Sequence, residues 1–328
     1  MGELLTVQDM LNRVYDSISK AIDVKVTGSN ATLIIEALSQ AVVKGEVLIV
    51  SGDATNYVGK TAYVYATADG YVALEAEIDG VWYQVVPSQT KVLEDVFTGV
   101  DGSALSSAWE ITKATNYTVN TWGKIYGNKM RLNVEASVGF AQAQALVNIP
   151  LYLSSEYVIE FDVDETIFSD ATTEMKVGLV PTKPADSQDV SGLAGAEILA
   201  WFYAGAVHRG ATTYNVAVAD TTQSYRVVVS ATSVKVYRGT EKIIDQADIL
   251  DQSQYYFYIQ LITTATAGLR THNSDDVNIY ARLASSKVNA NNLWVKTITD
   301  VIPGNLRVVF QNDLDNDNVV TIRLCGQP

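Results

Sequence analysis

The sequence has little of several residue types on which binding and catalytic sites commonly depend. Its 328 residues include one cysteine, Cys325, and two histidines, His208 and His272. A single cysteine excludes an intramolecular disulfide framework and any zinc site built from several cysteines. Two histidines leave little material for histidine-based catalysis or metal binding. We therefore expect no cofactor, apart from the calcium ion considered below.

Basic residues are also scarce, and long apolar runs are missing. Lys and Arg number 23 against 37 Asp and Glu, which gives a net charge of −14. Surfaces that bind nucleic-acid phosphates or anionic lipid need clustered Lys and Arg. The most apolar stretch, Ala194–Val207, contains Glu197 and is too short to cross a bilayer. The first residues lack the basic and apolar regions of a secretory signal. We expect a soluble protein with no nucleic-acid partner and no membrane insertion.

The first 27 residues carry an apolar seam. Its members recur at alternating spacings of three and four: Leu4, Val7, Leu11, Val14, Ile18 and Ala21. This pattern is typical of a coiled coil. A helix this short is marginal alone in water, so association or docking on a neighbour would supply the missing burial. Residues 1–27 are predicted to form a helical oligomerisation or attachment segment. An amphipathic helix packed on its own domain is the alternative.

Residues 28–90 are predicted to form a small α+β module. The spacing of apolar residues predicts a second helix over Ala31–Val43. The next runs are short and rich in Val and Tyr, and Asp69-Gly70 and Asp79-Gly80 separate the last three of them. Asp-Gly between alternating strands is a strong hairpin signal. We therefore expect one helix over a β-meander.

Residues 91–328 are predicted to form an antiparallel β-sandwich, so the chain as a whole is mainly β. Many short strands follow one another here, turn residues separate them, and no long helix interrupts them. Many short strands separated by turns are typical of a sandwich or barrel. A parallel α/β fold would need strands that alternate with helices.

Several of these stretches together resemble the concanavalin-A-like jelly roll of legume-type lectins, laminin-G-like modules and laminarinase-type glucanases. The residues that carry the resemblance are Phe97–Gly99 with Leu105 and Trp109, Gly127–Leu132, Tyr157–Val163, Met175–Val180, Tyr225–Val229 and Val234–Tyr237. The likeness is one of pattern, since no invariant motif carries it.

The order of the parts points further. A short heptad helix, a small module and a lectin-like sandwich, without a secretion signal, resemble a bacteriophage head fibre, tail fibre or head-decoration protein. The resemblance implies a homotrimeric structural protein of the virion, assembled in the host cytoplasm and attached to capsid or tail proteins. It also implies weak binding of cell-surface glycans and no enzymatic reaction. A laminarinase-type glycoside hydrolase and a monomeric carbohydrate-binding module are the alternatives.

Glu160, Asp162 and Glu165 fit the E-x-D-x-x-E pattern of laminarinase-type retaining glucanases. That resemblance implies a glutamate nucleophile, a glutamate acid/base and an aspartate that tunes them. A retaining site needs its two carboxyl groups about 5–5.5 Å apart. On a regular strand Glu160 and Asp162 share one face, so only a β-bulge would bring Glu165 to them. The alternative, which we favour, is a strand with an acidic, solvated face.

Three tryptophans are candidates for stacking on sugar rings: Trp109, Trp122 and Trp201. Trp109 and Trp122 stand at the starts of predicted strands, where an exposed ring is plausible, and Trp201 is expected to straddle core and surface. Filling the core is the alternative for each of them.

Asp313, Asp315 and Asp317 alternate as at the start of a calcium loop. An EF-hand would continue with Gly and Glu at positions that hold Asn318 and Leu324 here, so an EF-hand is excluded. A looser calcium loop and an acidic hairpin tip both fit the pattern.

Overall fold

The computed structural model describes residues 26–28, 31–43, 46–53, 61–67, 69–78, 80–169, 171–185, 188–215, 222–264, 268–298, 305–311 and 318–326. The predicted seam from Leu4 to Ala21 lies outside the described residues, as do Asp313, Asp315 and Asp317. No helix in the described part of the chain is both long enough and apolar enough to cross a membrane.

The chain divides into two compact units. The first combines Met1–Gln89 with Leu283–Pro328, and the second is Thr90–Arg282. We expected one sandwich from residue 91 to the C-terminus. The last strands pair with strands of the first unit instead, so the sandwich ends at Arg282. Such long-range pairing leaves no local sequence signal, because each strand shows only its own alternation.

The described residues of the first unit form two five-stranded sheets. One sheet has the order β1 (Val26–Gly28), β2 (Ala31–Val43), β26 (Asn318–Gly326), β4 (Thr61–Ala66), β24 (Leu293–Thr297). The other is built from β23 (Lys287–Val288), β5 (Gly70–Ile78), β25 (Asn305–Gln311) and β3 (Glu46–Asp53), with β6 (Val81–Val86) paired to β5. A 3-10 helix, η3 (Ala284–Ser286), precedes β23. Val64, Val72, Leu74 and Phe310 are fully buried and fill the core of this unit.

The predicted helix over Ala31–Val43 is wrong, because this segment is strand β2. It pairs antiparallel with β26, from Ile34 opposite Gly326 to Val43 opposite Asn318. Its β-branched Thr, Ile and Val residues lose rotamer freedom in a helix and suit a pleated sheet. The apolar residues of this segment fit the periodicity of a helix, but pairing with a strand almost three hundred residues away makes the segment a strand. The module is therefore not α+β within the described residues.

The two Asp-Gly pairs were predicted to mark hairpins. Strands β5 and β6 form the expected hairpin, with Ile78 opposite Val81, and Asp79 itself lies outside the described residues. Asp69-Gly70 connects β4 and β5, which belong to different sheets. The Asp69 carboxylate accepts a hydrogen bond of 2.7 Å from the backbone N–H of Ala290. The dipeptide thus makes a turn between sheets, and the predicted meander is wrong.

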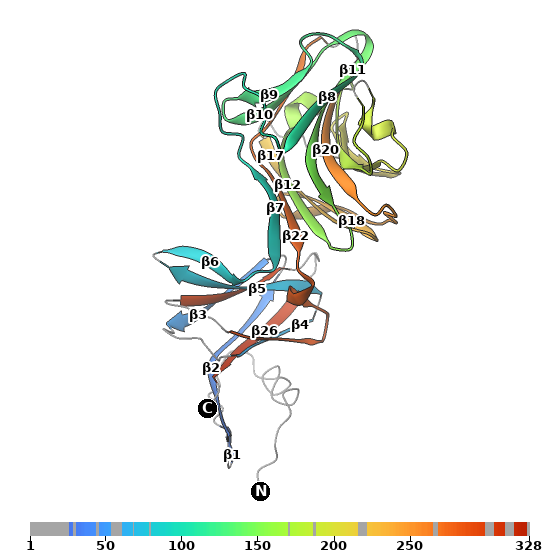
Figure 1. Cartoon of the computed structure of the whole chain (residues 1–328). Helices are drawn as coiled ribbons and strands as arrows, with labels where there is room; N and C mark the ends of the chain where they lie inside the picture. Colours follow the sequence, from blue (N-terminus) through green and yellow to red (C-terminus); the bar gives the residue numbers. More distant parts are fainter. Residues whose placement is uncertain are drawn as a thin grey trace. The chain divides into compact units, whose positions relative to one another are not determined.

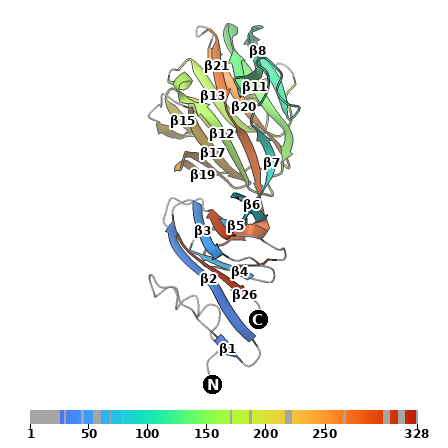
Figure 2. The same ribbon diagram turned by 90° about the vertical axis from the view of Figure 1, so that its left-hand side faces the viewer.

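The second unit is an antiparallel sandwich of two large sheets and one small sheet (Figures 1 and 2). The seven-stranded sheet has the order β16 (Thr212–Asn215), β15 (Ala206–Arg209), β14 (Glu197–Tyr203), β13 (Thr173–Val180), β20 (Tyr255–Thr264), β11 (Ala136–Leu151), β8 (Trp109–Tyr117). The six-stranded sheet has the order β19 (Glu241–Ala247), β18 (Ser233–Arg238), β17 (Thr222–Ser230), β12 (Tyr157–Asp164), β22 (Val277–Arg282), β7 (Gln89–Asp95). The three-stranded sheet is β21 (Arg270–Ser274), β10 (Lys129–Val134) and β9 (Trp122–Tyr126). Two 3-10 helices, η1 (Glu165–Phe168) and η2 (Val190–Gly192), lie in the loops.

The core of the sandwich comes from the alternation of apolar residues along its strands. On β12, Ile159, Phe161 and Val163 are buried, whereas Glu160 and Asp162 are only partly covered. Phe161 packs on Tyr225, with ring centroids 6.1 Å apart. The prediction of a mainly β chain with an antiparallel sandwich is confirmed.

Candidate functional site

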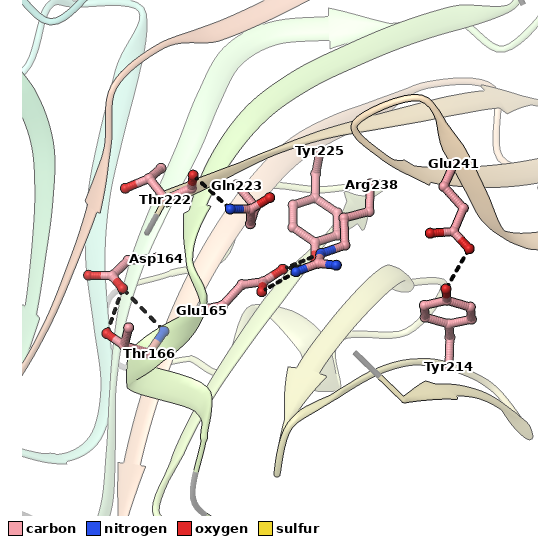
Figure 3. Close-up of polar contacts among 9 residues, drawn as sticks. All are labelled: Asp164, Glu165, Thr166, Tyr214, Thr222, Gln223, Tyr225, Arg238 and Glu241. Atoms are coloured by element: carbon pink, nitrogen blue, oxygen red, sulfur yellow. Dashed lines mark hydrogen bonds and ion pairs between the residues drawn. The ribbon is translucent and has the colours of Figure 1, made fainter. Parts of the chain in front are cut away.

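The proposed glucanase carboxylates do not meet on one face. Strand β12 pairs with β17 without a register shift from Tyr157 to Asp164, so no bulge turns the chain. After Asp164 the chain enters η1, where Glu165 is 3% exposed. Figure 3 shows the side chains of Asp164 and Glu165 extending in different directions, with Asp164 capping η1 through Thr166.

Glu165 is committed to a buried ion pair. Arg238 donates from Nε and Nη2 to the two carboxylate oxygens, both at 2.7 Å, and the Tyr225 hydroxyl donates at 2.6 Å (Figure 3). Burial, together with the neighbouring carboxylate, raises the pKa of Tyr225, so this phenol stays protonated as a donor. A carboxylate held by three charge-assisted hydrogen bonds is a structural group. The idea that a bulge joins Glu165 to Glu160 is therefore wrong.

Glu160 and Asp162 lie on the outer face of the six-stranded sheet. Glu160 stands opposite Arg226 on β17 and Asn278 on β22. Asp162 accepts a hydrogen bond of 2.7 Å from the Ser224 hydroxyl. Burial raises the pKa of Asp162, and the Ser224 hydrogen bond opposes that shift. These two carboxylates belong to a ladder of cross-strand polar pairs.

A different arrangement crosses the outer face of the seven-stranded sheet. Seven side chains stand opposite one another from strand to strand, and we call them the cross-strand row. In spatial order they are Thr112, Gln144, Gln260, Lys176, Trp201, His208 and Thr213. Directly opposed residues on antiparallel strands share a face and interact. The register therefore places polar groups and aromatic rings from all seven strands in one line.

One half of the cross-strand row is covered by the β13–β14 loop. Gln144 donates to Thr112 Oγ1 at 3.0 Å and to the Gln188 carbonyl at 2.8 Å. Gln260 donates to the Asp189 carboxylate at 2.8 Å. Burial alone would raise the pKa of Asp189, but hydrogen bonds, chiefly from Gln260, lower it below its usual value. This half of the row is a buried hydrogen-bond network that anchors the loop.

The other half is partly exposed and aromatic. The rings of Trp201 and Tyr203 stack with centroids 5.3 Å apart and an interplanar angle of 16°. The His208 imidazole lies 5.1 Å from the Trp201 ring, and its Nδ1 is 3.0 Å from Thr213 Oγ1. All three rings are half-buried. We call Trp201, Tyr203 and His208 the aromatic platform.

Polar groups flank the aromatic platform. The Trp201 indole N–H donates to the Glu174 carboxylate at 3.1 Å. Lys176 Nζ lies 5.7 Å from the centre of the Trp201 ring and 3.5 Å from Ser191 Oγ. The indole is thus held in one orientation from both sides. An oriented ring bordered by a carboxylate, an ammonium and hydroxyl groups can pack on the C–H face of a sugar while the polar groups bond its hydroxyls.

The three predicted tryptophans have different surroundings. Trp109 is 6% exposed, donates to Asp95 at 2.9 Å and packs on Phe97, so it is a core residue. Trp122 is half-buried on β9 and stacks on Tyr126. Only Trp201 belongs to the aromatic platform. The sequence analysis did not place the rings of Tyr203 and His208 beside Trp201. The alternation Trp201-Phe202-Tyr203 was the available signal for Tyr203, since it places two rings on one face.

The described residues contain no group of three or more His, Cys, Asp or Glu side chains placed to hold a metal ion.

No known family model matches the chain, and no curated protein sequence matches it. Solved structures with a similar arrangement include a pseudo β-1,3-glucanase and immunostimulatory antigen of Mycobacterium tuberculosis. It is 10% identical, with 59% of this chain and 99% of that chain covered and a TM-score of 0.42. Arcelin-5, a lectin-like defence protein of Phaseolus vulgaris, is 8% identical over 60% and 100% of the two chains, with a TM-score of 0.41. The laminarinase of Rhodothermus marinus is 11% identical over 60% and 99%, with a TM-score of 0.43. Likenesses this distant give no information about function.

Proposed function

We propose that the sandwich unit is a glycan-binding module and that its aromatic platform holds the sugar. The observation that carries the proposal is the half-exposed stack of Trp201 and Tyr203, with His208 beside it, at the open end of the cross-strand row. Large oriented aromatic rings at a surface provide binding energy at a low cost in side-chain entropy.

The flanking groups favour a neutral glycan. Glu174 and Lys176 bring one charge of each sign to the Trp201 ring, so the local charge is balanced. The Glu174 carboxylate can accept hydrogen bonds from sugar hydroxyls, and the Lys176 ammonium can donate hydrogen bonds to them. A balanced polar rim around an apolar ring suits an uncharged hexose.

The positions of the carboxylates on and after β12 support glycan binding without cleavage rather than hydrolysis. Glycoside hydrolysis requires a pair of carboxyl groups that flank the bond, about 5–5.5 Å or about 6.5–9.5 Å apart. Both oxygens of Glu165 are engaged by Arg238, so this residue is not available as a nucleophile or as an acid. This geometry supports a lectin-like function over the laminarinase alternative.

The test is titration of the protein with neutral glycans, beginning with laminarihexaose and lichenan oligosaccharides, by isothermal calorimetry. Trp201→Ala should weaken binding at least tenfold, since it removes the stacking surface. Trp122→Ala is the matched control, because Trp122 is also half-buried and stacked on a tyrosine. Equal losses in both variants, or release of reducing ends by the wild type, would contradict the proposal.

We propose in addition that the chain is a subunit of a phage particle and displays this module in several copies. The support is the heptad seam from Leu4 to Ala21, together with the low affinity expected of one small platform, which several linked copies would amplify. The solution mass of the full chain tests this by comparison with Leu11→Asp. A trimer that becomes monomeric in the variant supports it, and a monomeric wild type contradicts it.

A further inference from the structure

A second surface of the sandwich unit combines rings with cations. Trp122, Lys124 and Tyr126 alternate along β9 and share its outer face, and Arg131 on β10 stands directly opposite Lys124. Strands β9 and β10 lie side by side in Figure 1. We call these four residues the β9–β10 patch. It belongs to the three-stranded sheet and shares no residue with the aromatic platform.

The rings and cations of the β9–β10 patch are packed together. Trp122 and Tyr126 stack with centroids 5.3 Å apart and an interplanar angle of 29°. Lys124 Nζ lies 5.3 Å from the Trp122 ring centre, and the Arg131 guanidinium carbon lies 4.7 Å from the Tyr126 ring centre. Contacts of this kind hold a cation in place without neutralising it.

The two central cations have no carboxylate partner among the described residues. Lys129, the next cation on β10, forms an ion pair of 2.6 Å with Asp275. Arg131 instead donates from Nε to the neutral Asn273 side chain at 2.9 Å. Lys124 and Arg131 are therefore like charges at directly opposed positions, an arrangement that is destabilising unless an anion lies between them. The chain has a net charge of −14, so acidic side chains outnumber basic ones, and two neighbouring cations without a carboxylate partner stand out against that composition.

The surrounding chemistry favours one class of anion. The overall negative charge opposes densely charged polymers such as nucleic acid, which are held through many phosphates. A single carboxylate matches one ammonium and one guanidinium, since guanidinium and carboxylate are both planar groups. The stacked rings of Trp122 and Tyr126 beside the cations offer an apolar wall for a sugar ring.

We propose that the β9–β10 patch binds an oligosaccharide that contains a uronic acid. The carboxylate lies between Lys124 and Arg131, and the sugar ring packs against Trp122 and Tyr126. This site is separate from the neutral-glycan platform, and the two sites differ in the charge of their ligands.

The experiment is calorimetric titration of the full chain with trigalacturonate and with its methyl ester, which has the same rings without the charges. Trigalacturonate should bind, the ester at least tenfold more weakly, and added sodium chloride should weaken the acid form only. Lys124→Gln and Arg131→Gln should each weaken binding about tenfold, the loss expected for one charge-assisted hydrogen bond. Lys113→Gln is the matched control, because Lys113 Nζ lies 5.5 Å over the Tyr117 ring on β8.

Each outcome decides for or against the site. Selective loss in Lys124→Gln and Arg131→Gln, with the midpoint of unfolding unchanged, supports it. No binding by the wild type, equal binding of the ester, or displacement by an equal concentration of inorganic phosphate overturns it. Loss of trigalacturonate binding in Trp201→Ala overturns it too, because the acid would then occupy the aromatic platform. If neutral glycans do not bind but trigalacturonate does, only the platform proposal fails.

Discussion

The outer faces of the two large sheets of the sandwich unit satisfy their polar side chains in different ways. On the six-stranded sheet, Asp162 is bonded by Ser224 on the neighbouring strand, and Glu160 stands opposite Arg226. On the seven-stranded sheet, the polar groups form the cross-strand row, which ends in the partly exposed rings of Trp201 and His208 and in the exposed Thr213. The face with the more conspicuous charges in the sequence is thus internally paired, whereas the face with rings retains surface for a ligand.

The largest effect should come from breaking the buried pair behind the acidic face. Glu165→Gln leaves Arg238 partly buried without its counter-charge, which should lower the free energy of unfolding by about 4 kcal/mol. Glu160→Gln, on the solvated face, should change it by less than about 1 kcal/mol. Urea denaturation measures both. Equal stabilities of the two variants would show that Glu165 is no more structural than Glu160.

The buried histidine offers a pH-dependent contrast with the histidine of the platform. His272 is fully buried, and its two ring nitrogens have no hydrogen-bond partner among the described residues. Burial lowers its pKa from 6.5 to about 4. Between pH 6.5 and pH 4, His272 is therefore protonated in the unfolded chain and neutral in the folded chain. The free energy of unfolding falls as the pH drops through this range.

This linkage amounts to about 3 kcal/mol when the pH has fallen to 4. His272→Leu removes the titrating group, so the stability difference between wild type and variant should shift by that amount between pH 7.5 and pH 4. Chemical denaturation at the two pH values measures it. A difference that stays constant with pH would contradict the assigned burial of a neutral imidazole.

A smaller effect should come from the close packing beneath the β13–β14 loop. A Cβ at Gly178 would lie 2.3 Å from the Glu197 carbonyl oxygen and 2.5 Å from the Tyr258 hydroxyl. Gly178→Ala should therefore lower the free energy of unfolding by about 2 kcal/mol, as overpacking does. Gly192→Ala is the control, because its nearest neighbour would be a side-chain oxygen of Asp189 at 3.7 Å. Equal melting temperatures for the two variants would contradict the prediction, because they would show that β13 and β14 move apart at Gly178 at little cost in stability.

Some of this architecture was readable from the sequence and some was not. Alternation on β12 predicted both the sandwich and the buried residues Ile159, Phe161 and Val163, because burial on one face of a sheet leaves a period of two. The strand β2 was not predicted, since its partner lies near the other end of the chain. The aromatic platform was found only through Trp201. Register across β13, β14 and β15 brings Lys176, Trp201 and His208 together, and register has no local signature.

The role of the aromatic platform is tested most directly by the affinity of the full chain for a neutral oligosaccharide such as laminarihexaose, measured for the wild type, Trp201→Ala and Trp122→Ala. We expect at least a tenfold loss of affinity for Trp201→Ala and an unchanged affinity for Trp122→Ala. If Trp201→Ala binds the glycan with wild-type affinity, the ligand lies elsewhere and the aromatic platform is not the binding site.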